Sequence, residues 1–171
     1  MKIITETDRL ILREFVAEDL NRLSKILADE QVMRYSSTGV MTKEQTANLI
    51  KNNMYSYQIE GCGSFAVIHK DTNKLIGMCG CYPQEIDGPR EIEVVYKLQP
   101  NYWGKGLATE ALKATINYAH NTLKVNRLVA AIDKKNIPSI KVAEKVGMQY
   151  EKDSVYLGIP IFMYAIELKK N

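Results

Sequence analysis

The chain has 171 residues, of which 46% are hydrophobic and 25% are charged, and this balance is typical of a globular protein. The formal net charge is only +3, and the lysines and arginines are scattered, which argues against a nucleic-acid partner. No stretch has the apolar length of a membrane span and the N-terminus lacks the layout of a signal peptide, so we expect a single cytoplasmic domain over residues 1–171 with no membrane partner.

The N-terminal part is expected to form one strand and two helices. Polar and apolar residues alternate over Thr5–Glu14, which predicts a strand with one buried face, and we interpret its arginines as a solvated face. Apolar residues then recur at helical spacing over Ala17–Asp29. Residues Glu30–Val40 are polar and irregular. The segment Thr42–Gln45 has the spacing of a capping box, so the second helix is expected over Lys43–Gln58.

The middle of the chain is expected to form strands on either side of a long helix. Ser64–His69 and Lys74–Tyr82 are typical of a β-hairpin, and Glu91–Leu98 follows as a third antiparallel strand. Helical spacing predicts a helix over Leu107–Leu123, and the short apolar run Arg127–Asp133 predicts a buried strand. A strand, a helix and a further strand in this order imply a right-handed parallel crossover.

The C-terminal part is expected to form a short helix and two strands. Asn136 is suited to cap the helix, Pro138 fits its first turn, and Gly147 ends it. The last two strands are predicted over Met148–Val155 and Ile161–Leu168. No repeat, linker or low-complexity stretch interrupts the chain.

The cysteines and histidines show no pattern of their own. Cys62, Cys79 and Cys81 cannot all pair internally, and their number suits a reducing compartment. Cys79 and Cys81 share one face of a strand and could be metal ligands. Small buried residues are the favoured interpretation, because no second Cys or His pair completes a zinc site. We expect no metal, and we assign no role to the isolated His69 and His120.

A glycine turn lies between the central strand and the long helix. Within Tyr102–Ala111, Gly104 and Gly106 can adopt backbone angles that let several N–H groups converge ahead of the positive end of the helix. Such an arrangement binds an anion, most naturally a phosphate. A nucleotide P-loop is disfavoured because no Ser or Thr follows Lys105, and a dinucleotide fingerprint because Thr109 occupies the third glycine position. A diphosphate of another cofactor remains.

This turn resembles the signature of the GNAT superfamily of acetyl-CoA-dependent N-acyltransferases. The signature is Gln/Arg-x-x-Gly-x-Gly/Ala, and Asn101–Gly106 matches it except for the Asn in the first place. The longer run Tyr102–Ala111 resembles the branch with the ribosomal-protein N-terminal acetyltransferases and the spermidine acetyltransferases, as does the opening strand Thr7–Arg13. The resemblance covers nearly the whole chain and is most specific over Glu93–Ala111.

The resemblance implies an α/β (α+β) fold of one domain. Its central sheet would be mixed, mostly antiparallel, splayed at the cofactor site and flanked by about four helices. It also implies acetyl-CoA as cosubstrate, with its pantetheine arm on an exposed strand edge and on Asn136, and its diphosphate on the glycine turn. The residues expected to bind the cofactor are Tyr96, Lys97, Leu98, Trp103, Gly104, Lys105, Gly106, Leu107, Ala108, Thr109, Asn136 and Ser139.

Glu93 and Ser139 are the catalytic candidates. An ammonium group cannot attack a thioester, so a base must accept a proton, and Glu93 matches a glutamate of the branch. An exposed strand carboxylate without a role is an equal alternative. Many family members carry a tyrosine at the place of Ala143 that protonates the CoA thiolate; Ser139, one helical turn earlier, is its candidate replacement. A backbone N–H near Tyr96 would hold the oxyanion.

We therefore expect an N-acetyltransferase that moves an acetyl group from acetyl-CoA to a primary amine by direct transfer in a ternary complex. The amine would belong to a protein N-terminus or to a small molecule. A catalytically inactive acyl-CoA-binding regulatory domain is the first alternative, because the tyrosine is absent at Ala143. A structural domain without a cofactor is the second. Many relatives dimerise, so a homodimer stays open.

Two sets of residues flank the expected acceptor groove. An acidic set would suit a cationic acceptor and consists of Glu85, Asp87, Glu91 and Glu93. The helix over Lys43–Gln58 and the loop before it are expected to form one wall. Three tyrosines either line that wall or pack half-buried beside it, and they are Tyr35, Tyr55 and Tyr57.

Overall fold

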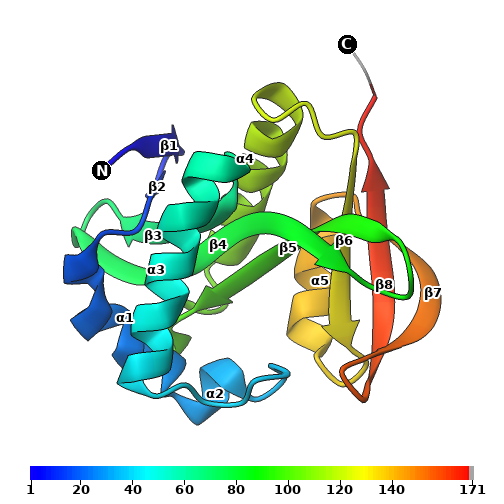
Figure 1. Cartoon of the computed structure of the whole chain (residues 1–171), viewed down its shortest axis with the longest axis horizontal. Coiled ribbons are helices and arrows are strands. Elements are labelled where there is room, and N and C mark those ends of the chain that lie inside the picture. The colour runs from blue at the N-terminus through cyan, green and yellow to red at the C-terminus, as the bar shows by residue number, and fades with distance from the viewer. Residues whose placement is uncertain (170–171) are drawn as a thin grey trace.

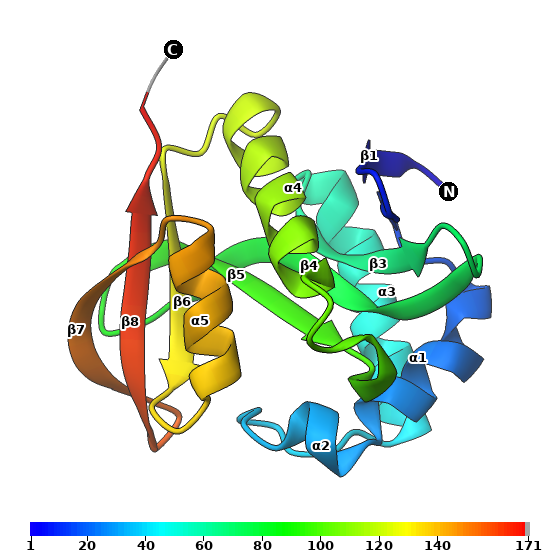
Figure 2. The same ribbon diagram turned by 180° about the vertical axis from the view of Figure 1, so that it is seen from behind.

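The computed structural model describes residues 1–169, and these form one sheet with helices on both faces (Figures 1 and 2). Within this described part the sheet has eight strands in the order β1-β2-β3-β4-β5-β6-β8-β7. The strands are β1 (Ile3–Glu6), β2 (Leu10–Arg13), β3 (Gly63–His69), β4 (Lys74–Glu85), β5 (Arg90–Leu98), β6 (Arg127–Asp133), β7 (Gln149–Tyr156) and β8 (Ile159–Glu167). The α-helices are α1 (Leu20–Leu27), α2 (Glu30–Met33), α3 (Lys43–Ile59), α4 (Leu107–Asn121) and α5 (Ile137–Lys145).

Neighbouring strands run antiparallel except at one place, the pair of β5 and β6, which is parallel. Helix α4 connects these two strands, as expected for a crossover. The predicted mixed, mostly antiparallel sheet is therefore confirmed. None of the helices in residues 1–169 is long and apolar enough to cross a membrane.

The hydrophobic core lies on both faces of the sheet. On one face Phe65 and Leu128 pack with Leu112 of α4 and with α5. On the other face Phe15 packs with α1 and α3, around buried residues such as Leu23. Figure 1 shows α3 in front of the sheet, and Figure 2 shows α4 and α5 in front of the opposite face. Burying one such side chain contributes about 2 kcal/mol, so the helices are held by their apolar faces.

Helix α3 begins where the capping box predicts. The Thr42 hydroxyl accepts a hydrogen bond from the Gln45 N–H at 3.1 Å, and the Gln45 side chain accepts one from the Thr42 N–H at 2.8 Å. Both N–H groups would otherwise lack partners at a helix start. Gly61 follows the end of the helix with a φ of +68° and turns the chain toward β3.

Three predictions about the N-terminal part are corrected. Thr5–Glu14 forms two strands, because Thr7 closes a turn with Leu10 through backbone and side-chain hydrogen bonds of 2.9 Å. The polar run Thr5–Arg9 interrupts the alternation and marks this turn in the sequence. The helix expected over Ala17–Asp29 is a 3-10 turn followed by α1. The segment expected to be irregular contains α2, whose first turn is capped by Asp29.

The three cysteines are buried and free, consistent with the favoured interpretation as core residues. In the described residues no group of three or more His, Cys, Asp and Glu side chains is placed to hold a metal.

Gly77 of β4 allows β5 to approach closely. A Cβ atom at this position would lie 2.0 Å from the carbonyl oxygen of Lys97 and 2.8 Å from Cα of Leu98. Both contacts are to backbone, so no side-chain rotation can relieve them. The end of β5 therefore depends on the absence of a side chain at Gly77.

We predict that Gly77→Ala lowers the free energy of unfolding by about 2 kcal/mol or more, because the added methyl group forces two strands apart. Gly158→Ala is the control, since a Cβ there meets nothing within 4 Å and only the positive φ of +78° is strained, at about 1 kcal/mol. Urea unfolding of both variants measures the difference. Equal losses would show that the contact with β5 is not the constraint.

Candidate active site

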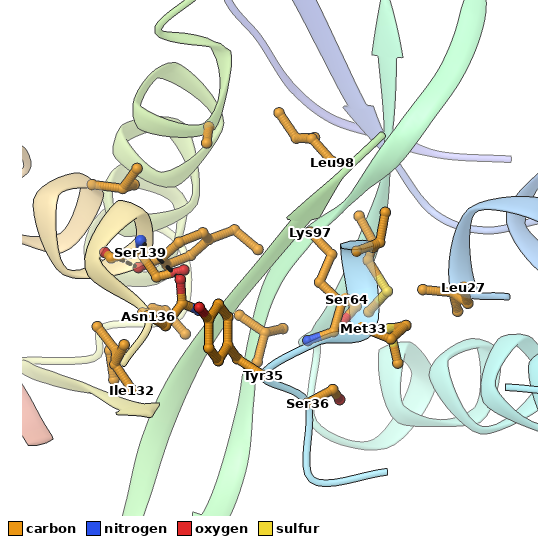
Figure 3. A pocket seen from close by; sticks show the side chains of 18 of the residues that line it. Leu27, Met33, Tyr35, Ser36, Ser64, Lys97, Leu98, Ile132, Asn136 and Ser139 are labelled. Carbon is orange, nitrogen blue, oxygen red and sulfur yellow. Dashed lines mark hydrogen bonds between the residues drawn. The ribbon is translucent and has the colours of Figure 1, made fainter. Parts of the chain in front are cut away.

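The sheet opens into a cleft where β5 and β6 part. The two strands share one register pair, Glu93 with Val129. Beyond it Val94–Leu98 and Ala130–Asp133 line opposite sides of a cleft of about 1190 Å³. Figure 3 shows Lys97 and Leu98 on one side and Ile132, Asn136 and Ser139 on the other. The ladder between two parallel strands is thus broken, and their facing backbone groups are available to a ligand.

Most of the predicted site residues surround this cleft. Those that line it are Glu93, Tyr96, Lys97, Leu98, Trp103, Gly104, Gly106, Leu107, Ala108, Thr109, Asn136 and Ser139. Lys105 does not line it. Its side chain borders a second, smaller cavity together with Arg22 and Lys74. The residues therefore meet in one place, while the role of each stays a prediction.

The glycine turn presents the N-terminus of α4 to the cleft. Gly106 is the N-cap residue with a φ of +75°, and no side chain caps the helix. The first N–H groups of a helix have no partner within it, and together with the helix dipole they attract an anion. Trp103 fixes the approach to the turn, because its Nε1–H donates to the Leu98 carbonyl at 2.7 Å. The turn can hold a phosphate group.

Two N-terminal residues hold the glycine turn from behind. The Arg9 guanidinium donates to the Lys105 carbonyl at 2.9 Å and to the Glu110 carboxylate at 2.7 Å. The Thr7 hydroxyl donates to the same carboxylate at 2.6 Å. Burial of Glu110 by itself would raise the pKa of its carboxyl group. The hydrogen bonds from Thr7 and Arg9 outweigh this effect, so the pKa is lowered. Thr7, Arg9 and Glu110 thus form a clamp on the turn.

The interpretation of the N-terminal arginines as a solvated face holds for Arg9, which is exposed, and is wrong for Arg13, whose side chain is 13% exposed. Arg9 belongs to the clamp, and Arg13 forms an ion pair with Asp19 through two hydrogen bonds of 2.7 Å. Sequence reasoning missed the clamp because its members lie about a hundred positions apart. The one available signal was Glu110, an acid in the first turn of a helix that has no side-chain cap.

Glu93 is a buried carboxylate on the floor of the cleft. Its side chain is 6% exposed, so the alternative of an exposed strand carboxylate is wrong. Burial raises its pKa to about 7, although the Ala131 N–H, the Lys97 charge and the Tyr82 hydroxyl favour the ionised form. A group with this pKa exchanges protons at neutral pH. Glu93 can therefore accept a proton from a ligand in the cleft.

The start of α5 is tied to β5 across the cleft. The Asn136 side chain accepts a hydrogen bond from the Ser139 N–H at 3.3 Å, which confirms it as the helix cap. The Tyr96 hydroxyl donates to the Ser139 carbonyl at 2.8 Å. Ala143 is fully buried and does not line the cleft. At this side of the cleft, α5 therefore contributes the hydroxyl group of Ser139, and β5 contributes the hydroxyl group of Tyr96.

The acidic set does not gather at the cleft. Asp87 pairs with Lys152 at 2.6 Å and Glu91 pairs with Arg127 at 3.2 Å. Of the four acids only Glu93 is among the lining residues. The tyrosines also separate. Tyr35 lines the cleft, Tyr55 is exposed outside it, and Tyr57 stacks on Phe65 with ring centroids 5.4 Å apart.

The chain resembles known acetyltransferases in sequence and in structure. The family model described as "Acetyltransferase (GNAT) domain" matches residues 9–149. A Bacillus licheniformis protein named as an uncharacterized N-acetyltransferase, p20, is 32% identical over 168 residues, which cover 94% of this chain and 93% of the relative. The solved structure of an acetyltransferase (GNAT family) from Bacillus anthracis covers 98% of both chains with a TM-score of 0.82 and 31% identity.

A structure of the ribosomal α-N-protein acetyltransferase RimL in complex with coenzyme A also matches. It covers 98% of both chains with a TM-score of 0.82 and 19% identity, which is a similarity of fold alone.

We predict that the clamp adds stability only where Glu110 is ionised. Its pKa is lowered in the folded state, so the contribution is present above the usual pKa of a glutamate and is lost as the pH falls through the lowered value. Glu110→Gln should lower the free energy of unfolding at pH 7 by on the order of 1 kcal/mol, and by less at pH 3. Denaturant unfolding at both pH values measures this. The same loss at both pH values would contradict it, and Glu18→Gln, at an exposed site, is the control.

Proposed function

The chain belongs to the GNAT acetyltransferase family and is an N-acetyltransferase that uses acetyl-CoA, and from this premise we propose that it acetylates a primary amine by direct attack in a ternary complex. The observation that carries the proposal is the cleft itself. It joins an anion-binding turn, an unpaired strand edge and a buried carboxylate with a pKa of about 7. Each part matches one requirement of acyl transfer to an amine.

The cleft fits acetyl-CoA on its α4 and α5 side. The turn from Gly104 to Thr109 suits the diphosphate, because its helix N-terminus has no side-chain cap. The backbone of β5 beyond Glu93 has lost its β6 partner and suits the amide groups of the pantetheine arm. Asn136 lines the cleft and has an amide N–H₂ group to offer the same arm. We therefore assign the predicted cofactor residues to binding the diphosphate and the pantetheine arm of acetyl-CoA, except for the side chain of Lys105.

Glu93 is the proposed general base. It accepts a proton from the acceptor amine, directly or through a water molecule, and the neutral nitrogen then attacks the thioester carbonyl. The C–N bond forms to give a tetrahedral intermediate, whose oxyanion is held by the backbone N–H of Tyr96. The C–S bond then breaks, and the second proton that the nitrogen loses ends on the CoA thiolate. No covalent intermediate on the protein is required. The buried position of Glu93 supports this role, since burial is what keeps its pKa near neutrality.

Ser139 is the proposed hydrogen-bond donor to the leaving thiolate, and its hydroxyl stabilises the thiolate without giving up its proton. Its hydroxyl is on the first turn of α5, beside the cleft, and the residue is held in place through Asn136 and Tyr96. Ala143 is fully buried in the core and carries no hydroxyl, so the family tyrosine has no equivalent at this position in this chain. The alternative of a regulatory domain that binds acyl-CoA without turnover rests on this missing group.

We predict that Glu93→Gln lowers kcat by about 100-fold or more at neutral pH, because the amide cannot accept a proton. In the parent, kcat should rise with pH through about 7 as Glu93 ionises. This limb of the pH profile should be absent in the variant. Release of free CoA thiol from acetyl-CoA measures the rate, and Glu91→Gln is the matched control on the same strand. An unchanged limb in Glu93→Gln would contradict the assignment.

We predict that Ser139→Ala lowers kcat by about 10-fold while the KM for acetyl-CoA changes little, because a donor to the thiolate acts in the transition state. Ser24→Ala on α1, away from the cleft, is the control. A rise in KM alone would make Ser139 a binding residue, and a parental kcat would remove it from the mechanism. Calorimetry with CoA separates these outcomes from a failure to bind, and binding without turnover of any amine would favour the regulatory domain.

A further inference from the structure

Lys97 brings a cation into the part of the cleft opposite α5. Side chains alternate along β5, and Val94 and Leu98 pack with the α4 side of the core while Val95 packs against the core around α1 and α3. Lys97 has the same parity as Val95 and Glu93, so its side chain lies on the α1 and α3 side. Figure 3 shows it extending from the strand toward the segment that carries Tyr35 and Ser36.

The Lys97 ammonium has no ion-pair partner in the part of the chain that the structure describes. Within residues 1–169 no carboxylate lies within 4.0 Å of the Lys97 ammonium, and no hydrogen bond of that group is formed. Burial lowers the pKa of Lys97, and the charge of Glu93 only partly offsets this. An ammonium held away from water gains stability when an anion binds beside it.

The other charges on this side of the cleft are few. Arg34 is exposed at the rim, where its guanidinium lies 5.4 Å from the centre of the Tyr35 ring. Asp133 ends β6, and its carboxylate accepts a hydrogen bond from the Lys135 N–H at 2.8 Å. Neutral polar side chains make up much of the remaining wall, and they are Ser36, Ser37, Thr38, Gln45, Asn48, Asn52, Asn53 and Ser56.

We propose that the acceptor amine also carries a carboxylate, which Lys97 binds while the amine lies near Glu93. This inference rests on the proposed function, because it names the acceptor class of the same site. The two charged side chains line one cleft with opposite signs, and a molecule with both an amine and a carboxylate matches them. A polyamine would place a second cation beside Lys97. The cationic acceptor suggested by the acidic set is therefore replaced, because three of those four acids lie outside the cleft.

The test compares acceptors that differ in one group. The panel contains ω-amino acids of increasing length, the primary amides of the same acids, and the diamines of the same length. A charge-assisted hydrogen bond that the amide cannot form corresponds to a preference of roughly 10- to 100-fold. We expect kcat/KM of the best acid to exceed that of its amide and of its diamine by this factor.

Two lysine variants assign the preference to one residue. Lys97→Met should reduce the ratio of acid to amide to about one, and Lys97→Glu should reverse the order so that the diamine is preferred. Lys141→Met changes a lysine on the α5 wall of the same cleft and should leave the ratio as in the parent. The ratio is the readout because a general loss of activity or of folded protein cancels from it. An equal ratio for acid and amide in the parent, or a ratio that survives in Lys97→Met, overturns the proposal.

A wrong role for Lys97 and a wrong proposed function would give different experimental results. If amides or diamines are acetylated at least as well as acids, the transferase stands and the role of Lys97 is wrong. If no amine is acetylated, the transferase assignment fails, and calorimetry of the CoA-loaded protein with the same acids and amides still tests Lys97. Tighter binding of acids, lost in Lys97→Met, would support its role, and equal binding would overturn it.

Discussion

The candidate site depends on the point at which β5 and β6 stop pairing. These parallel neighbours share a single register pair, Glu93 with Val129, and beyond it each strand keeps only its other neighbour, β4 or β8. Backbone groups without partners inside a fold require water or a ligand. Both crossover helices also begin beside this gap, and α4 directs its uncapped N-terminus into it. One break in a ladder thus creates the cleft, a hydrogen-bonding edge and an anion site together.

Charged side chains inside the cleft differ from many of those outside it in whether they form ion pairs. Outside the cleft several charged side chains form ion pairs. Arg127 binds the carboxylates of Glu91, Glu151 and Glu167, and these contacts raise the pKa of its guanidinium. Inside the cleft Glu93 and Lys97 belong to one strand face but form no ion pair with any described residue. Their environments push the glutamate toward its neutral form and lower the pKa of the lysine. A buried carboxylate and a lysine on one strand face, both without an ion pair among the described residues, thus distinguish this cleft as the candidate site.

Local patterns predicted much of the fold and half of the site. The capping box at Thr42, the crossover around α4 and the cap at Asn136 depend on neighbours in the sequence, so they could be identified from it. The clamp that links Arg9 to Glu110 depends on contacts made only after folding. The turn at Thr7 is local and lies in the polar run Thr5–Arg9, which the interpretation as one strand overlooked. In the structure, alternation along β5 puts Glu93 and Lys97 on one face of the sheet. The alternation could not predict which acidic residues form ion pairs outside the cleft, and these ion pairs decide which charges remain in the cleft.

The energetic cost of Glu93 bears on whether the cleft binds or catalyses. A shift of its pKa from 4.5 to about 7 means that the ionised form opposes folding, with a cost that grows as the pH rises through this interval. Above the folded pKa the cost reaches about 3 kcal/mol, since each unit corresponds to about 1.4 kcal/mol. A glutamine would fill the same volume without this cost and would still donate and accept hydrogen bonds. This cost favours the proposed enzyme over a domain that only binds acyl-CoA, because a base with a pKa near neutrality serves the deprotonation of an amine and has no part in holding acyl-CoA.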